Sequence, residues 1–149
     1  MSEETTSAKP AQNALNLIAT IKSPEDQKLL QAMLEQSGGL NSEILTAVGT
    51  VHFARFVFLC NNTQLALFTD YDGDLDTYVL DFIKVAHDLF NALLMHMADP
   101  PPLPVQAHPK EFLQWVRDHD APCVAGYYYS AYPKLKVQDI LSLEQSSGA

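Results

Sequence analysis

Four aspartates alternate along the segment TDYDGDLD, residues 69–76, and they surround one glycine. Carboxylates at positions 70, 72 and 74 match the first three ligand positions of an EF-hand calcium loop. Such a loop places glycine sixth and glutamate twelfth, whereas here Gly73 is fourth and Asp81 is twelfth. The residue types suit a cation but their register does not, so the sequence predicts no dedicated metal site.

The same aspartates fit the junction of a strand and a helix. Asp70 ends an apolar strand, and Asp72–Gly73 makes the turn. Asp72 or Asp74 then caps the next helix, because a carboxylate there accepts hydrogen bonds from free backbone N–H groups and meets the positive end of the helix dipole. In this interpretation, which is favoured over a metal site, the aspartates have a structural role in the turn and the helix cap.

A second group of polar residues lies in two neighbouring apolar stretches. Asn61 and Asn62 separate these stretches and predict a β-hairpin with a two-residue turn. In that register Arg55 lies opposite Phe68 and diagonal to Asp70 on the same face. Two roles stay open for Arg55: it forms a structural ion pair with Asp70, or it meets an anionic ligand in a pocket.

His52 and the tyrosines near the C-terminus also have two possible roles. The hairpin register places His52 beside Tyr71, either as a hydrogen-bonded structural imidazole or as a pocket group. Tyr127, Tyr128 and Tyr129 either present hydroxyls to a small ligand or pack a strand and an interface. The candidate ligand-binding residues are therefore His52, Arg55, Asp70, Tyr71, Asp72, Tyr127 and Tyr129.

The elements that must position these residues follow from the spacing of apolar side chains. Alternation predicts strands, and a repeat of three to four residues predicts helices. The first helix is expected to stop at Gly38–Gly39. The expected strands cover residues 14–22, 50–60, 63–71 and 121–132, and the expected helices begin at Pro24, Leu75, Pro109 and Lys136.

This order of elements belongs to the α+β class and is that of the split βαβ, or ferredoxin-like, arrangement. It predicts a four-stranded antiparallel sheet with helices on one face and an extra helix before the last strand. Both faces of the hairpin are apolar, so the face away from the helices needs a cover, which a homodimer through the sheets would supply. Residues 14–144 then form a single domain between flexible tails at 1–13 and 145–149.

Charge and composition limit the partners and the compartment. The 149 residues carry a net charge of −9 with no cluster of Lys or Arg, which argues against a nucleic-acid partner. No apolar run approaches membrane-spanning length, and the polar start MSEETTSAKPAQ lacks the pattern of a secretory signal. Cys60 and Cys123 show no metal-ligand spacing, which favours a reducing compartment. We expect a cytoplasmic protein without a membrane partner.

The stretches VHFARFVFL and LALFTDYDGDLDTYVLDF, between Val51 and Phe82, resemble a group of small bacterial proteins of the dimeric α+β barrel class. The wider superfamily includes antibiotic-biosynthesis monooxygenases, chlorite dismutase and dye-decolourising peroxidases. The resemblance implies a homodimer with a pocket between sheet and helices, and often oxidative or haem chemistry. Asp72–Gly73 matches the end of the Gly-x-x-Asp-Gly motif of the peroxidases, while Thr69 stands where that motif begins with glycine.

Three functions are consistent with these observations. The leading one is a homodimer that binds a small organic molecule, as a cofactor-free oxidoreductase would. The second is a haem-binding, peroxidase-like protein, which needs a histidine aimed into the pocket, with His96 on the flank of the long helix as a candidate. The third is a non-enzymatic dimeric interaction module. The sequence names no catalytic residue, because the common nucleophile, phosphate-loop and zinc motifs are absent.

Overall fold

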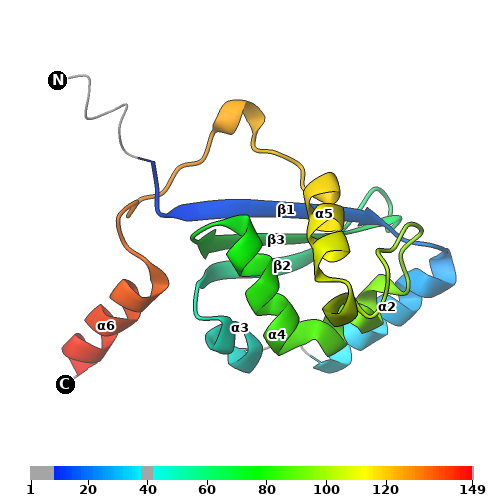
Figure 1. The fold of residues 1–149 in the computed structure, drawn as a ribbon, viewed down its shortest axis with the longest axis horizontal. Coiled ribbons are helices and arrows are strands. Elements are labelled where there is room, and N and C mark those ends of the chain that lie inside the picture. The colour runs from blue at the N-terminus through cyan, green and yellow to red at the C-terminus, as the bar shows by residue number, and fades with distance from the viewer. Residues whose placement is uncertain (1–8, 38–41, 149) are drawn as a thin grey trace.

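The computed structural model describes residues 9–37 and 42–148 and shows an α+β fold (Figure 1). The first eight residues of the expected N-terminal tail, the expected helix stop at Gly38–Gly39 and the last residue of the C-terminal tail lie outside the described residues. The strands are β1 (Gln12–Thr20), β2 (Val51–Leu59) and β3 (Gln64–Asp72). The helices are α2 (Pro24–Ser37), α3 (Ser42–Val48), α4 (Leu75–Leu94), α5 (Pro109–His119) and α6 (Val137–Gly148).

The sheet has three antiparallel strands in the order β1-β3-β2. The predicted four-stranded ferredoxin-like sheet is therefore wrong, although the α+β class is right. The expected last strand, residues 121–132, contains only a short 3-10 turn at Val124–Gly126. The extra helix before it, α5, is present where it was predicted.

The segment that was expected to be the fourth strand follows the outer edge of β1 without pairing along it. At its first residue the Ala121 N–H donates to Asn16 O of β1, and just past its last residue Pro133 O accepts from the N–H of Ala11, the residue before β1, both at 2.8 Å. Between these contacts it is more than twice as long as the stretch of β1 that it passes, so its middle loops outward. Prolines that lack an N–H donor and the left-handed backbone of Ala125 (φ 52°) prevent a continuous ladder.

The hairpin register is confirmed over most of its length. Arg55 lies opposite Phe68, as predicted. The register shifts between Val51 and Phe53, so that His52 occupies a β-bulge and does not pair with Tyr71. The turn is longer than expected, because positive φ angles extend over Cys60, Asn61 and Asn62.

Helices cover one face of the sheet and form the core with it (Figure 1). Leu17 and Leu67 pair across β1 and β3 on this face, and Phe82 and Phe90 of α4 belong to the same buried cluster. On the opposite face Phe53 is 62% exposed. We call this opposite face the open face and define it by Ile18, Phe53, Arg55, Val57 and Phe68, which alternate with the core residues along the strands.

The TDYDGDLD segment forms the predicted strand-to-helix junction. Gly73 has φ of 90°, a conformation that favours glycine, and it turns the chain out of β3. Asp74 is the N-cap of α4, where its Oδ2 accepts from the Thr77 N–H at 3.1 Å and its Oδ1 from the Thr77 hydroxyl at 2.9 Å. The backbone hydrogen bond and then the hydroxyl lower the pKa of Asp74. Of the two predicted caps, Asp74 is the one in place.

We expect Asp74→Ala to lower Tm by about 2–4 °C at neutral pH, because it leaves the first turn of α4 without its cap. The lowered pKa means that the charged cap stabilises the fold above the ordinary pKa of 3.8 and loses this effect as pH falls through the lower, folded value. Thermal unfolding from pH 7 to 3 should therefore show the variant and wild type converging. Asp88→Ala, on the exposed side of α4, is the control, and an equal loss there would contradict the assignment.

Candidate functional site

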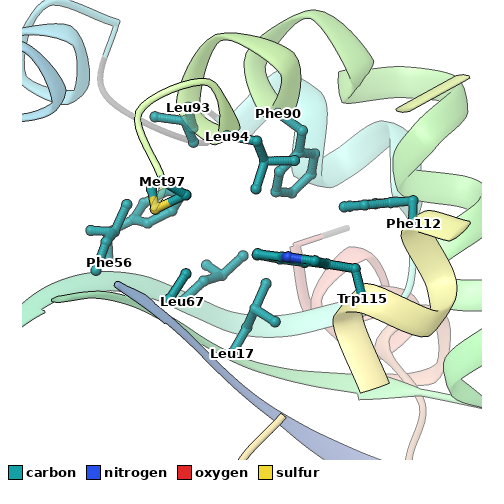
Figure 2. A pocket seen from close by; sticks show the side chains of 11 residues that line it. Leu17, Phe56, Leu67, Phe90, Leu93, Leu94, Met97, Phe112 and Trp115 are labelled. Atoms are coloured by element: carbon teal, nitrogen blue, oxygen red, sulfur yellow. The ribbon is translucent and has the colours of Figure 1, made fainter. Parts of the chain in front are cut away.

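The cavities in the core between the sheet and helices α4 and α5 are too small for an organic ligand. A cavity of about 30 Å³ lies there, with Leu17 and Leu67 of the sheet facing Phe90 and Trp115 of the helices (Figure 2). A neighbouring core cavity holds about 20 Å³. Ligand pockets occupy about 300–1,000 Å³, and a single water needs about 10–15 Å³. A third, more open hollow of about 260 Å³ lies on the same side of the sheet between α2 and the hairpin, lined by Gln31, Leu34, Glu35, Phe56, Phe58 and Leu65. The ligand pocket expected between sheet and helices is therefore absent from the core beneath α4 and α5.

A larger cleft lies on the open face, beneath the segment that loops away from β1. Its volume is about 300 Å³, the lower end of the range for small-molecule sites. We call it the Tyr128 cleft. The residues that line it are Gln12, His52, Phe53, Asp70, Tyr128, Tyr129, Ser130, Ala131 and Tyr132.

Hydrogen bonds between distant parts of the chain hold the loop over the sheet. The Tyr128 hydroxyl donates to Asp70 Oδ1 at 3.1 Å. Gln12 Nε2 donates to the backbone oxygens of Tyr132 at 3.2 Å and Leu135 at 2.7 Å. These contacts tie the roof of the cleft to β3 and β1, so the cleft has fixed walls on both sides.

Burial, and then the negative charge of Asp70, raises the pKa of Tyr128 far above the range of ordinary tyrosines. The phenol therefore stays protonated and remains a donor to Asp70. Asp70 Oδ2 accepts no hydrogen bond from the described residues, which leaves one carboxylate oxygen for a ligand. The Asp70–Tyr128 pair thus offers an acceptor at the cleft.

His52 is held at the base of the cleft by a buried carboxylate. Its Nε2 lies 2.7 Å from Asp72 Oδ1, and the two side chains are only 4% and 6% exposed. The second oxygen, Asp72 Oδ2, accepts from the Val137 N–H at 2.7 Å. Because a carboxylate accepts, His52 Nε2 must carry the proton, and Nδ1 of the neutral ring keeps a lone pair. Such a His–Asp pair is suited to accept a proton from a bound molecule.

Three of the seven predicted ligand-binding residues line the Tyr128 cleft: His52, Asp70 and Tyr129. Asp72 lies directly behind His52. Tyr127 is 77% exposed and lies outside the lining. The sequence analysis thus selected two cleft residues from the strands, His52 and Asp70, and one from the loop that covers the cleft, Tyr129.

Tyr71 and Arg55 have other roles. Tyr71 faces the helices, where its ring stacks on Tyr78 at 4.1 Å and burial raises its pKa to about 12. The guanidinium of Arg55 lies over the Phe68 ring, 5.1 Å from its centroid, and no ion pair joins Arg55 to Asp70, both of which the structure describes. A cation–π contact therefore replaces the ion pair that was one of the two predicted roles.

The sequence analysis missed Gln12, Phe53, Ser130 and Tyr132 as cleft residues. Gln12 fell inside the predicted N-terminal tail, although β1 begins there. The sequence did contain a signal for Phe53. An aromatic residue two positions before Arg55 lies on the same face of the strand, away from the helices, and a large apolar side chain there indicates a binding surface. The positions of Ser130 and Tyr132 depend on the path of the loop, which no local sequence pattern predicts.

His96, the candidate haem ligand, belongs to a separate polar cluster. Its Nδ1 lies 2.7 Å from Asp26 Oδ1, and Asp26 Oδ2 accepts from the Ser23 hydroxyl at 2.5 Å. Hydrogen bonds from Ser23 and then His96 lower the pKa of Asp26. The cluster ties the start of α2 to the end of α4, and His96 lines none of the cavities described above.

The described residues contain no group of three or more metal-ligating side chains that could hold an ion. None of their helices combines the length and the apolar character that crossing a membrane requires. Comparisons with family models, with curated proteins and with solved structures find no match to the chain. The functional argument therefore rests on the geometry of the Tyr128 cleft.

We expect Asp72→Asn to move the proton of neutral His52 from Nε2 to Nδ1. The Val137 N–H needs an acceptor and takes the single amide oxygen, so the amide NH₂ faces His52 Nε2, which must then accept. Two-bond ¹H–¹⁵N correlation spectra of the imidazole distinguish the two tautomers.

Asp70→Asn is the matched control for this change, because Asp70 lies on the same strand and has Tyr128 as its hydrogen-bond partner. His52 should keep its Nε2–H tautomer in that variant. An Nε2–H tautomer that persists in Asp72→Asn would contradict the proposed role of the carboxylate.

Proposed function

We propose that the protein binds a small organic molecule in the Tyr128 cleft. The observation that carries this proposal is the convergence of His52, Asp70 and Tyr128, from β2, β3 and the loop, in a cleft that the rings of Phe53, Tyr129 and Tyr132 also line. Few polar groups at fixed positions within an apolar wall are typical of small-molecule sites. We also propose that the protein acts in the cytoplasm. Cys60 and Cys123 are both free, as cysteines usually are in a reducing compartment.

The His52–Asp72 pair gives the cleft a means of moving a proton. His52 Nδ1 would accept a proton from the bound molecule, and Asp72 would stabilise the resulting imidazolium. In a cofactor-free oxidoreductase this base would assist a substrate that passes its electrons to a second substrate such as O₂. The ring of Tyr132, whose centroid is 6.1 Å from that of His52, limits the orientations a ligand can take. These contacts favour acid–base chemistry within a cofactor-free enzyme over a role as an interaction module alone.

Haem fits this site poorly. His52 is the histidine among the residues that line the cleft, and its Nε2 is already held by Asp72, which leaves only Nδ1 for an iron atom. The volume of about 300 Å³ also favours a smaller ligand. We expect a haemin titration followed by absorption to show only nonspecific binding. A saturable Soret band that disappears in His52→Ala would replace our proposal with the haem-binding one.

Tyr127 and Tyr129 provide a matched pair of variants for the binding proposal. Both are tyrosines of the same loop with similar exposure, 77% and 75%, but only Tyr129 lines the cleft. We expect Tyr129→Ala to weaken ligands selected from a fragment library by about tenfold, because a ring contact is lost, and Tyr127→Ala to leave affinity unchanged. Chemical-shift titrations measure both affinities and locate the ligand.

The same titrations would also contradict the binding proposal in either of two ways. If no fragment perturbs the resonances of the cleft, or if the two variants weaken binding equally, the cleft is not the binding site. A thermal melt of each variant checks that the loop change has left the fold intact.

We further propose that the open face pairs with a second copy of the chain. Phe53 is largely exposed there, beside the partly buried Val57 and Phe68. A twofold axis across this face would bring these apolar side chains of the two copies together. This pairing would also cover the mouth of the Tyr128 cleft, since Phe53 belongs to both surfaces.

We expect sedimentation equilibrium at micromolar concentration to give a dimer for the wild type and a monomer for Val57→Asp, because the variant places a charge in the apolar contact. Leu80→Asp, an exposed apolar residue on α4, is the control and should remain dimeric. A monomeric wild type would remove the dimer from the proposal without affecting the binding site.

A further inference from the structure

The Tyr128 cleft is lined by a carboxylate, that of Asp70, and by no lysine or arginine. The His52–Asp72 pair is neutral if the imidazole is protonated and carries one negative charge if it is not. In either state the cleft is net negative, which disfavours an anionic ligand and favours a cationic one.

Two acceptors belong to the carboxylate and the imidazole of the cleft, beside the hydroxyls of Tyr129, Ser130 and Tyr132. Tyr128 already donates its hydroxyl proton to Asp70 Oδ1, which leaves Asp70 Oδ2 open. His52 uses its Nε2 proton on Asp72, so that Nδ1 of the neutral ring can only accept. A ligand that satisfies both acceptors must supply N–H or O–H donors.

The walls of the cleft complete this preference. Phe53, Tyr128, Tyr129 and Tyr132 contribute four aromatic rings. The faces of aromatic rings attract cations, and an adjacent carboxylate adds to that attraction. Tyr128 keeps its own proton and donates it in a hydrogen bond to Asp70 throughout the physiological range, because burial raises its pKa above the ordinary value of a tyrosine.

We infer that the Tyr128 cleft binds a small organic cation, a primary or secondary ammonium carried on an apolar body. This inference rests on the proposed function and names the ligand class of the same site. The ammonium group donates to Asp70 Oδ2 and His52 Nδ1, and the apolar body packs against Phe53 and the tyrosine rings.

The test compares three probes of similar size and different charge: benzylammonium, benzyl alcohol and benzoate. Their affinities are measured by chemical-shift titration of the wild-type protein at low ionic strength. We expect benzylammonium to bind about tenfold more tightly than benzyl alcohol, and benzoate to bind more weakly than either. Added salt should weaken benzylammonium alone, because its attraction is screened.

Asp70→Asn identifies the source of the preference. This variant should bind benzylammonium and benzyl alcohol with similar affinity, whereas Asp88→Asn, which removes a charge from the exposed side of α4, should behave as wild type. An unchanged preference in Asp70→Asn would overturn the inference, because the selectivity would then come from overall charge.

Two further outcomes separate this inference from the proposed function. If benzyl alcohol binds as tightly as benzylammonium and both are lost in Tyr129→Ala, the cation preference is wrong and the binding site stands. If none of the three probes perturbs the resonances of the cleft at millimolar concentration, the cation inference is also wrong. The proposed function fails only if no member of the wider fragment library perturbs them either.

Discussion

The side chain of Asp72 joins β2 and the start of α6 to β3 beside the cleft. It ends β3 opposite Gln12 of β1, accepts from the bulged His52 of β2, and accepts from the first N–H of α6. Each of these donors is buried or partly buried, and an unsatisfied buried donor costs about 1–3 kcal/mol. The orientation of His52 and the position of the chain that leads into α6 therefore depend on one side chain.

The cleft exists because a fourth strand does not form. Had residues 121–132 paired along β1, Tyr128 would lie in the plane of the sheet and no space would open above Asp70. Pro122 and Pro133 mark the ends of the looped part, and the positive φ of Ala125 turns it outward. The same segment then returns over the open face and places its tyrosine beside the carboxylate. A departure from regular secondary structure thus creates the concave surface on which the proposed function depends.

The sequence predicted the features that depend on local chemistry. The hairpin register of Arg55 and Phe68, the cap at Asp74 and the start of α5 at Pro109 all follow from neighbouring residues, and all three are confirmed. The wrong predictions concern competition between distant parts of the chain. Alternating residues in the tyrosine segment satisfied the strand pattern, but the prolines and the contacts of Asp70 and Gln12 favoured a loop. The partnership of His52 with Asp72 could not be read from the sequence, because a bulge changes which side chains share a face.

The bulge at His52 and the proline-bounded loop also determine how the sheet meets other chains. A long, regular edge strand invites strand-by-strand addition and, with it, fibrillar aggregation. Here the outer edge of β1 is screened by a segment that cannot continue the ladder, and the outer strand β2 is interrupted where the register shifts. Both edges are poor templates for a further strand, which disfavours strand-by-strand association of this sheet.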